Sequence, residues 1–121
     1  MGTITLAEWA LKVGKTLEET DRAIKLEVLT DLVYNTREDT GRLRGNWQVS
    51  EGAAKTGTLE RLDKVGNTTI AQESKNITPA SLTWYANNLD YAPVWNERDA
   101  IIARAQARFG QIVRLAISEV K

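Results

Sequence analysis

Cysteine and histidine are both missing from this chain of 121 residues, and proline occurs only twice. Without a thiol or an imidazole there is no disulfide, no thiolate nucleophile, no Cys/His zinc site and no imidazole base. These absences exclude many of the common enzyme mechanisms. The sequence predicts no catalytic residue, no metal site and no cofactor.

An excess of charge of one sign is missing as well, because 16 Lys and Arg residues balance 16 Asp and Glu residues. Nucleic-acid-binding proteins usually carry a basic domain or stripe, since phosphate contacts supply most of their affinity. No apolar run approaches the length of a membrane span, about 18 residues, and Met1–Val13 lacks the apolar segment of a secretory signal. Length and composition predict one globular domain over residues 1–121.

Hydrophobic periodicity predicts a long helix in the first part of the chain. Thr5 and Glu8 have the spacing of a capping box. Behind them one apolar stripe recurs every three or four residues, which predicts a helix to about Asn35. The stripe consists of Leu6, Trp9, Val13, Leu17, Ile24, Val28 and Leu32.

The length of this helix points to a partner. Thirty residues at ~1.5 Å each form a rod of about 45 Å, longer than the roughly 35 Å diameter of a compact domain of this size. Either the helix breaks at Gly14, or its first turns extend beyond their own domain. In the second case Trp9 and Val13 need a partner to cover them, and a neighbouring subunit is the simplest candidate.

The middle of the chain has β-type patterns. Residues 46–50 alternate with Trp47 and Val49 on one face, and residues 82–87 alternate with Trp84 on an apolar face. We expect both tryptophans in the core. Residues 51–67 hold three glycines among small and charged residues, which predicts a mobile loop, and residues 69–75 can form two helical turns.

A second amphipathic helix is predicted from Asp99, as its N-cap, to the end of the chain, although it could begin at Asn96. Its apolar stripe consists of Ile102, Ala105, Phe109, Ile112, Ala116 and Val120, and its polar face carries Arg104, Arg108 and Arg114. The expected fold is therefore α+β: a long N-terminal helix, a small antiparallel β-sheet with a mobile loop, and a packed C-terminal helix.

Several polar groups have both a functional and a structural interpretation. Glu18, Glu19 and Asp21 are clustered carboxylates that could act as acid or base, but we expect them to form a solvated helix face. Asp90, which lies near Asn87 and Asn88, could serve a carboxylate-dependent hydrolase, but these residue types also favour a turn.

Two basic segments suggest further functions. The glycine-rich residues 40–45 suggest a phosphate-binding loop, but they lack the Gly-Lys-Ser/Thr ending of such a loop. The Arg104, Arg108 and Arg114 face leaves open a small DNA-binding or regulatory protein.

Two segments resemble a known family. Residues 35–50 read NTREDTGRLRGNWQVS, and residues 84–94 read WYANNLDYAPV. Their order resembles the tail-completion and head–tail joining proteins of tailed bacteriophages, a group that includes the minor tail protein Z-like and neck proteins. In that family a helix closes with T-P-x-D-T-G-x-L-x-x-x-W, and Y-x-N-x-x-x-Y-A follows later. The matching residues include Asp39, Thr40, Gly41, Leu43, Trp47 and Tyr91, whereas the family's proline is missing and Arg37 and Glu38 occupy that stretch.

The first motif makes physical sense as a corner between a helix and a strand. Asp39 and Thr40 are expected to bind backbone groups left free by the ending helix, Gly41 to permit the turn, and Leu43 and Trp47 to fill the core.

The resemblance implies a virion structural protein without enzymatic activity that joins head to tail or completes the tail end. It would form a homo-oligomeric ring around the DNA channel, with a hexamer as one candidate. Its partners would be other head–tail connector and tail proteins, DNA would pass through without specific binding, and no membrane is involved. The protein would reside at the head–tail junction of the virion, and in the host cytoplasm during assembly.

The ring interpretation assigns roles to residues outside the motif. Trp9, Val13 and Trp95 are the candidate subunit-interface residues, because tryptophan is frequent in protein–protein hot spots. The arginines at 104, 108 and 114 are candidates for the lumen or a partner contact. The loop 51–67 would become ordered against a neighbour or line the lumen.

Overall fold

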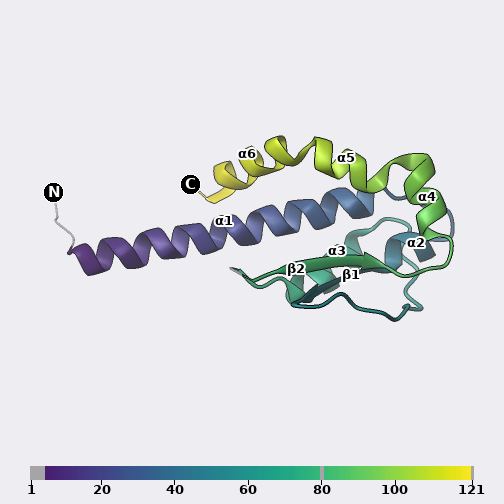
Figure 1. Cartoon of the computed structure of the whole chain (residues 1–121), viewed down its shortest axis with the longest axis horizontal. Coiled ribbons are helices and arrows are strands. Elements are labelled where there is room, and N and C mark those ends of the chain that lie inside the picture. The colour runs from purple at the N-terminus through teal and green to yellow at the C-terminus, as the bar shows by residue number, and fades with distance from the viewer. Residues whose placement is uncertain (1–4, 80, 121) are drawn as a thin grey trace.

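The structure, a computed structural model, describes residues 5–79 and 81–120, except for the side chains of residues 9–15, 119 and 120. The fold is α+β, with a two-stranded antiparallel sheet among helices. On one side of the long first helix α5 and α6 run back along it, and on the other lie the sheet and α3 (Figure 1). The elements are α1 (Leu6–Asn35), α2 (Arg42–Gly45), β1 (Trp47–Glu51), α3 (Asn67–Glu73), η1 (Ser74–Asn76), β2 (Thr83–Asn87), α4 (Ala92–Asp99), α5 (Ile101–Ala107) and α6 (Phe109–Val120).

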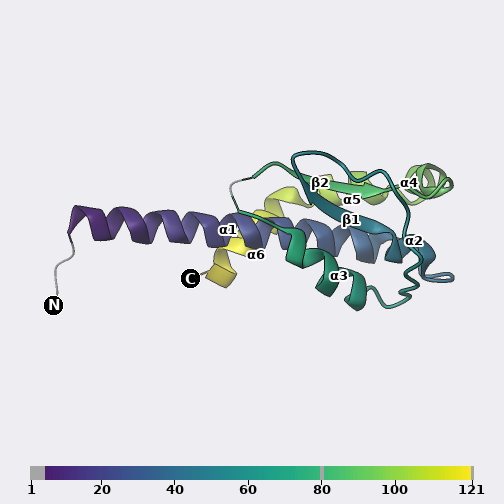
Figure 2. The ribbon, with the colours of Figure 1, turned by 90° about the horizontal axis from the view of Figure 1, so that it is seen from below.

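The first helix begins where its capping residues predict. Thr5 Oγ1 accepts a hydrogen bond from the backbone N–H of Glu8 at 3.1 Å, and Glu8 Oε2 accepts one from the N–H of Thr5 at 3.3 Å. The capping box is thus confirmed. The helix continues through Gly14 to Asn35 without a break, and its first turns extend beyond the rest of the molecule (Figures 1 and 2). Of the two alternatives for this helix, the long rod is correct.

The pairing of the two strands decides which side chains face the core. Val49 lies opposite Tyr85, and Ser50 lies opposite Trp84. Residues directly opposite one another share a face of the sheet, so the buried Val49 brings Tyr85 to the inner face and places Trp84 on the outer one. Trp84 is 42% exposed, and its prediction as a core residue is wrong, whereas Trp47 is buried as predicted.

The connection from β1 to α3 has no regular secondary structure, as its glycines predict. Asn46 exchanges hydrogen bonds of 2.7 and 2.9 Å with the backbone of Leu59, and Asn88 Nδ2 donates to the carbonyls of Lys55 and Gly57. These side chains attach the connection to the domain, and its mobility stays a prediction.

The last part of the chain forms three helices rather than one. Asp99, predicted as an N-cap, is the last residue of α4. Ala100 follows with a left-handed φ of 50°, and α5 starts at Ile101. A left-handed residue ends a helical hydrogen-bond ladder, so the predicted single helix from Asp99 is wrong.

The hydrophobic core lies where the second half of α1 meets the sheet and α5. Its buried residues are Leu29, Leu32, Val33, Trp47, Val49, Ile77, Ile101 and Ala105. Ile112 and Ala116 of α6 are also buried, and α6 packs on α1. The predicted C-terminal stripe is only partly correct, because Ile102 and Phe109 are exposed and Ile101 is buried instead.

Candidate functional site

The corner between α1 and β1 is tied together by a buried pair of side chains. The hydroxyl of Thr36 donates to the carbonyl of Leu32 at 2.7 Å and accepts a hydrogen bond from Trp47 Nε1 at 2.9 Å. Thr36 and Trp47 are both buried. The end of the helix is thereby fixed to the start of the strand, as the corner interpretation of the motif requires.

Gly41 is the turning point of this corner. Its φ is 83°, and its carbonyl accepts hydrogen bonds from the N–H groups of Gly45 and Asp63, both at 2.9 Å. A Cβ atom at this position would stand 2.6 Å from the backbone nitrogen of Lys64. Both the conformation and the close approach require glycine, which confirms the predicted role of Gly41.

The neighbouring motif residues act differently from the prediction. Thr40 Oγ1 accepts a hydrogen bond from the N–H of Arg42 at 3.3 Å, so it binds the start of α2 rather than the end of α1. Asp39 adopts a positive φ of 33° and is exposed. Leu43 is buried, in a small cluster with Leu89 and Ala92, as predicted.

Arg44 is a buried cation that sequence reasoning missed. Its Nε donates to the carbonyl of Thr36 at 2.7 Å, Nη1 to that of Lys64 at 2.7 Å, and Nη2 to that of Tyr34 at 3.3 Å. Arginine has five donors in a rigid fork, which suits it to joining several carbonyls. The side chain therefore connects the end of α1, the corner and the loop before α3. The only signal in the sequence was its place between Gly41 and Gly45, where chain segments can approach closely.

A second buried network joins the corner to α3. Arg61 Nη1 lies 3.0 Å from Glu73 Oε2, and Glu73 Oε1 accepts the backbone N–H of Val49 at 2.8 Å. Arg61 Nε also donates to the carbonyl of Gly45 at 2.8 Å. Because these charged groups are paired with one another and with the backbone, they hold the corner, β1 and the loop before α3 together.

Trp95, a predicted interface residue, is partly covered by its own chain. The guanidinium of Arg37 lies 4.1 Å from the centre of its ring and that of Arg98 lies 5.4 Å away, both at distances typical of cation–π contacts. Arg37 Nε also pairs with Asp99 Oδ2 at 2.7 Å. This hydrogen bond holds the pKa of Asp99 below its ordinary value. Tyr91 lies beside Trp95 in the same shallow depression, next to Arg37.

The three arginines of the C-terminal segment do not form one free basic face. The guanidinium of Arg108 pairs with the carboxylate of Asp31 on α1, and Arg104 Nη1 donates to the carbonyl of Asp99 at 3.4 Å. Arg114 is exposed on α6. The side chains of Trp9 and Val13, the other predicted interface residues, lie outside the described residues.

The polar residues singled out in the sequence lie on α1 and in the segment after β2. Asp90 is exposed, and Asn87 Nδ2 donates to the backbone carbonyl of Leu43 at 2.7 Å, in keeping with a turn. Glu18 and Glu19 are exposed on α1, as expected for a solvated face. Within residues 5–79 and 81–120, no three carboxylates gather closely enough to bind a metal ion.

An apolar groove of about 510 Å³ lies between α1, β2 and α5. Its lining includes Ile24, Val28 and Leu32 from α1, Leu82 and Tyr85 from the β2 side, and Ile102, Ala105 and Phe109 from α5 and the start of α6. Tyr85 is anchored there, because its hydroxyl donates to the carbonyl of Lys25 at 2.7 Å, and burial raises its pKa.

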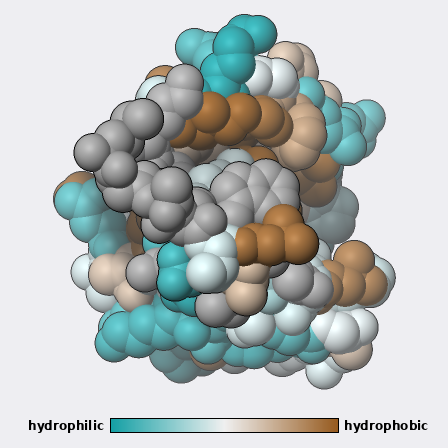
Figure 3. All heavy atoms as spheres, turned by 90° about the vertical axis from the view of Figure 1, so that its left-hand side faces the viewer, coloured by the Kyte–Doolittle hydropathy of each residue, from teal (hydrophilic) through white to brown (hydrophobic). Residues whose placement is uncertain are grey.

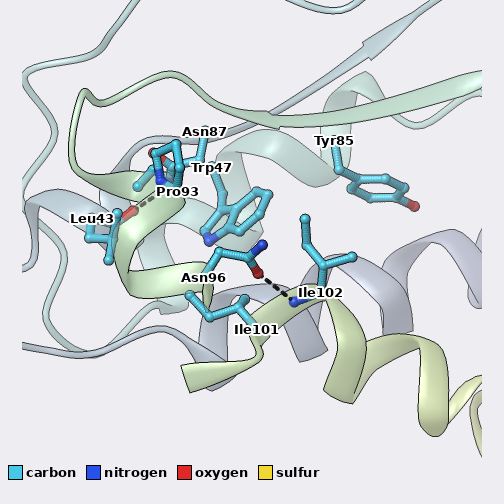
Figure 4. A pocket seen from close by; sticks show the side chains of 9 residues that line it. Leu43, Trp47, Tyr85, Asn87, Pro93, Asn96, Ile101 and Ile102 are labelled. Atoms are coloured by element: carbon cyan, nitrogen blue, oxygen red, sulfur yellow. Dashed lines mark hydrogen bonds between the residues drawn. The ribbon is translucent and has the colours of Figure 1, made fainter. Parts of the chain in front are cut away.

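A smaller pocket of about 200 Å³ adjoins the groove and shares Trp47, Tyr85 and Ile102 with it. Figure 4 shows the Trp47 ring in the middle of this pocket and Asn96 bound to the backbone of Ile102. Viewed along α1 from its N-terminal end, hydrophobic side chains are exposed in the upper part of the surface, on the side of α6 (Figure 3). The arrangement is suited to holding an apolar partner, since the two charged residues of the groove lining, Asp21 and Lys25, pair with one another at 2.9 Å.

Comparison of the chain with family models, with curated proteins and with solved structures finds no match. In the described part of the chain, no helix combines the length and the hydropathy of a membrane span. The candidate functional surface is therefore inferred from the structure alone. It consists of the corner between α1 and β1, the part of α1 that extends beyond the domain, and the apolar groove.

Proposed function

We propose that this chain is a non-enzymatic structural subunit of a tailed bacteriophage, which joins the head to the tail or completes the tail end as part of a ring around the DNA channel. The observation that carries the proposal is the helix α1, whose first half extends beyond its own domain. An exposed amphipathic helix of this kind requires a neighbour, and a ring supplies one to every subunit.

The corner residues support the choice of family. Gly41, Leu43 and Trp47, which the resemblance aligns with the phage motif, form the turn and its buried anchors. Arg37, in the stretch where the family has its proline, is held by its ion pair with Asp99. The subunit would be located in the virion at the head–tail junction, would contact other connector and tail proteins, and would let DNA pass without specific binding.

The alternative of a DNA-binding or regulatory protein has less support. Arg108 is paired with Asp31 and Arg104 is bound to the end of α4, so the proposed basic face offers few free charges for phosphates. A carboxylate-dependent hydrolase has little support as well, since Asp90 is exposed and, among the described residues, belongs to no group of three carboxylates that could hold a metal ion.

The native mass tests the proposal. We expect size-exclusion chromatography with light scattering, over a series of concentrations, to show a discrete multiple of the 13.5 kDa chain. Negative-stain electron microscopy of that species is expected to show closed rings with a central channel. A monomer at every concentration, or a dimer that forms no ring, would contradict the proposal.

A further inference from the structure

We infer that the apolar groove between α1, β2 and α5 receives the first half of α1 from a second copy of this chain. The inference rests on the proposed function for the number and symmetry of the copies, and it names the contact by which they assemble. The groove is the acceptor, and residues 6–20 of the neighbouring α1 are the donor.

The acceptor has the size and lining of a helix-binding groove. Its floor is the apolar face of the second half of α1, and its walls are β2 and α5. The side chains on the rim are open to solvent: Leu82 is 67% exposed and Phe109 is 51% exposed. Grooves of this type bind amphipathic helices through apolar anchors spaced three, four and seven residues apart.

The donor has the length and spacing that such a groove requires. Residues 6–20 span about 22 Å along the helix axis, and the stretch of α1 from Asp21 to Leu32 that lines the groove spans about 17 Å. Leu17 on the donor is 65% exposed. In the sequence, Leu6, Trp9, Val13 and Leu17 recur at three- and four-residue intervals.

The donor cannot fill the groove of its own chain. Because α1 runs straight through Gly14, its first half points away from the domain (Figure 2). Leu17 and Ile24 are seven residues apart, about two turns, so the donor stripe continues the line of the groove floor on the same helix face. The first half of α1 can therefore contact the groove of another copy but not the groove of its own chain.

Charge does not oppose this docking. The two charged residues that line the groove, Asp21 and Lys25, pair with one another at 2.9 Å. The donor carries Glu8, Glu18 and Glu19 against two lysines. The contact therefore depends on the apolar residues of the donor and of the groove.

The direction of docking decides the symmetry of the assembly. If the donor enters the groove parallel to the acceptor's α1, each copy offers a free groove to the next, and the contacts continue from copy to copy, as a ring where the rotation closes and as a filament where it does not. If it enters antiparallel, two copies fill each other's grooves and the assembly closes as a dimer. The proposed function requires the first direction.

Paired substitutions at exposed positions test the contact. Leu17→Glu places a charge on the donor, and Leu82→Glu places one on the groove. Leu62→Glu is the matched control, because Leu62 is also 67% exposed but does not line the groove. We expect the first two variants to be monomers by light scattering at concentrations where the wild type and L62E assemble, with unchanged circular dichroism in all three.

Mixing the two variants gives a second test, because a misfolded variant would not form the expected pair. L17E retains an intact groove and L82E retains an intact donor helix, so the two together can form one contact. We expect a 1:1 pair of twice the monomer mass from the mixture, and none from either variant alone. Assembly of L17E or L82E at wild-type concentrations, or a mixture without pairs, would overturn the inference.

The outcomes separate the contact from the proposed function. A wild-type ring that survives both substitutions overturns the inference and leaves the proposed function standing. A wild-type dimer that both substitutions dissociate supports the inference and contradicts the ring. A wild-type monomer at every concentration overturns both.

Discussion

Buried charged side chains define the corner of this protein at the scale of single residues. Arg44, Asp63 and Glu73 are nearly inaccessible to solvent, and each is bonded to backbone groups. An unpaired buried charge costs several kcal/mol, so such residues are retained where their hydrogen bonds hold segments together. They stabilise the irregular chain between β1 and α3, which contributes few residues to the core.

Asp63 makes the stability of this network depend on pH. Burial alone would raise its pKa, but hydrogen bonds from the N–H groups of Thr69 at 2.6 Å and Gly66 at 2.9 Å, together with the charge of Arg61, outweigh burial and hold the pKa below its ordinary value. A lowered carboxyl pKa stabilises the folded state above the ordinary pKa of about 4, and this contribution is lost as pH falls through the folded value.

We expect Asp63→Asn to lower the free energy of unfolding at pH 7 by about 1–3 kcal/mol, because an amide has only one oxygen for two N–H donors. The difference from the wild type should shrink when urea unfolding is repeated below pH about 4, since only the wild type titrates there. Asp90→Asn, at an exposed carboxylate, is the control, with an expected change within about 0.5 kcal/mol. A difference that stays constant with pH would contradict this role.

Gly41 allows a direct test of the corner. Gly41→Ala forces a side chain into left-handed backbone and against the backbone nitrogen of Lys64. We expect a loss of roughly 2–4 kcal/mol in urea unfolding, from conformational strain and overpacking together. The control is Gly57→Ala, where a Cβ meets nothing within 4 Å and the expected change is within about 0.5 kcal/mol. Equal effects of the two substitutions would show that the corner does not depend on glycine.

At the scale of elements, the sequence predicts well those segments whose signals are local. The capping box of Thr5 and Glu8 and the apolar stripe behind it lead to α1, and the alternation around Trp47 leads to β1. The two turns over residues 69–75 correspond to α3 and η1. In each case the pattern and its end signal lie within a few residues of one another.

The predictions from sequence that were wrong or missing mostly concern features that depend on distant residues. Trp84 belongs to the more apolar face of its strand, yet pairing with β1 turns that face outward, and only the register of the other strand decides this. The role of Arg44 depends on carbonyls from three separate segments. The break after Asp99 falls at an alanine, a residue type that normally continues a helix.

The break at Ala100 leads to a prediction about the C-terminal helices. Ala100 has a φ of 50°, and left-handed backbone costs a non-glycine residue roughly 1–2 kcal/mol. We expect Ala100→Gly to raise the free energy of unfolding by about 1 kcal/mol. Ala103→Gly, the same change in the exposed middle of α5, is expected to lower it by about 1 kcal/mol. Urea unfolding of the two variants checks the prediction, and a loss of stability in A100G as large as that in A103G would show that α4 and α5 form one continuous helix.

At the scale of the whole molecule, packing is distributed unevenly along α1. Leu29, Leu32 and Val33 lie in the core, whereas Leu6 and Leu17 are exposed on the part that extends beyond the domain. A helix without tertiary packing is only marginally stable in water, even over about 12–15 residues. The first half of α1 therefore needs an intermolecular contact to be as stable as the second.

Amide hydrogen exchange measures this difference directly. In samples dilute enough to be monomeric, we expect residues 6–20 to exchange at least about tenfold faster than residues 24–33, because the helix frays from its free end at little cost. At concentrations where the protein assembles, residues 6–20 should become protected, since the groove of a second copy now covers their apolar face. The second half of α1 serves as the internal control, and L17E at the same concentration should abolish only the added protection. Residues 6–20 that are equally protected in the dilute monomer would show that α1 needs no partner, and the strongest reason for expecting a ring would be lost.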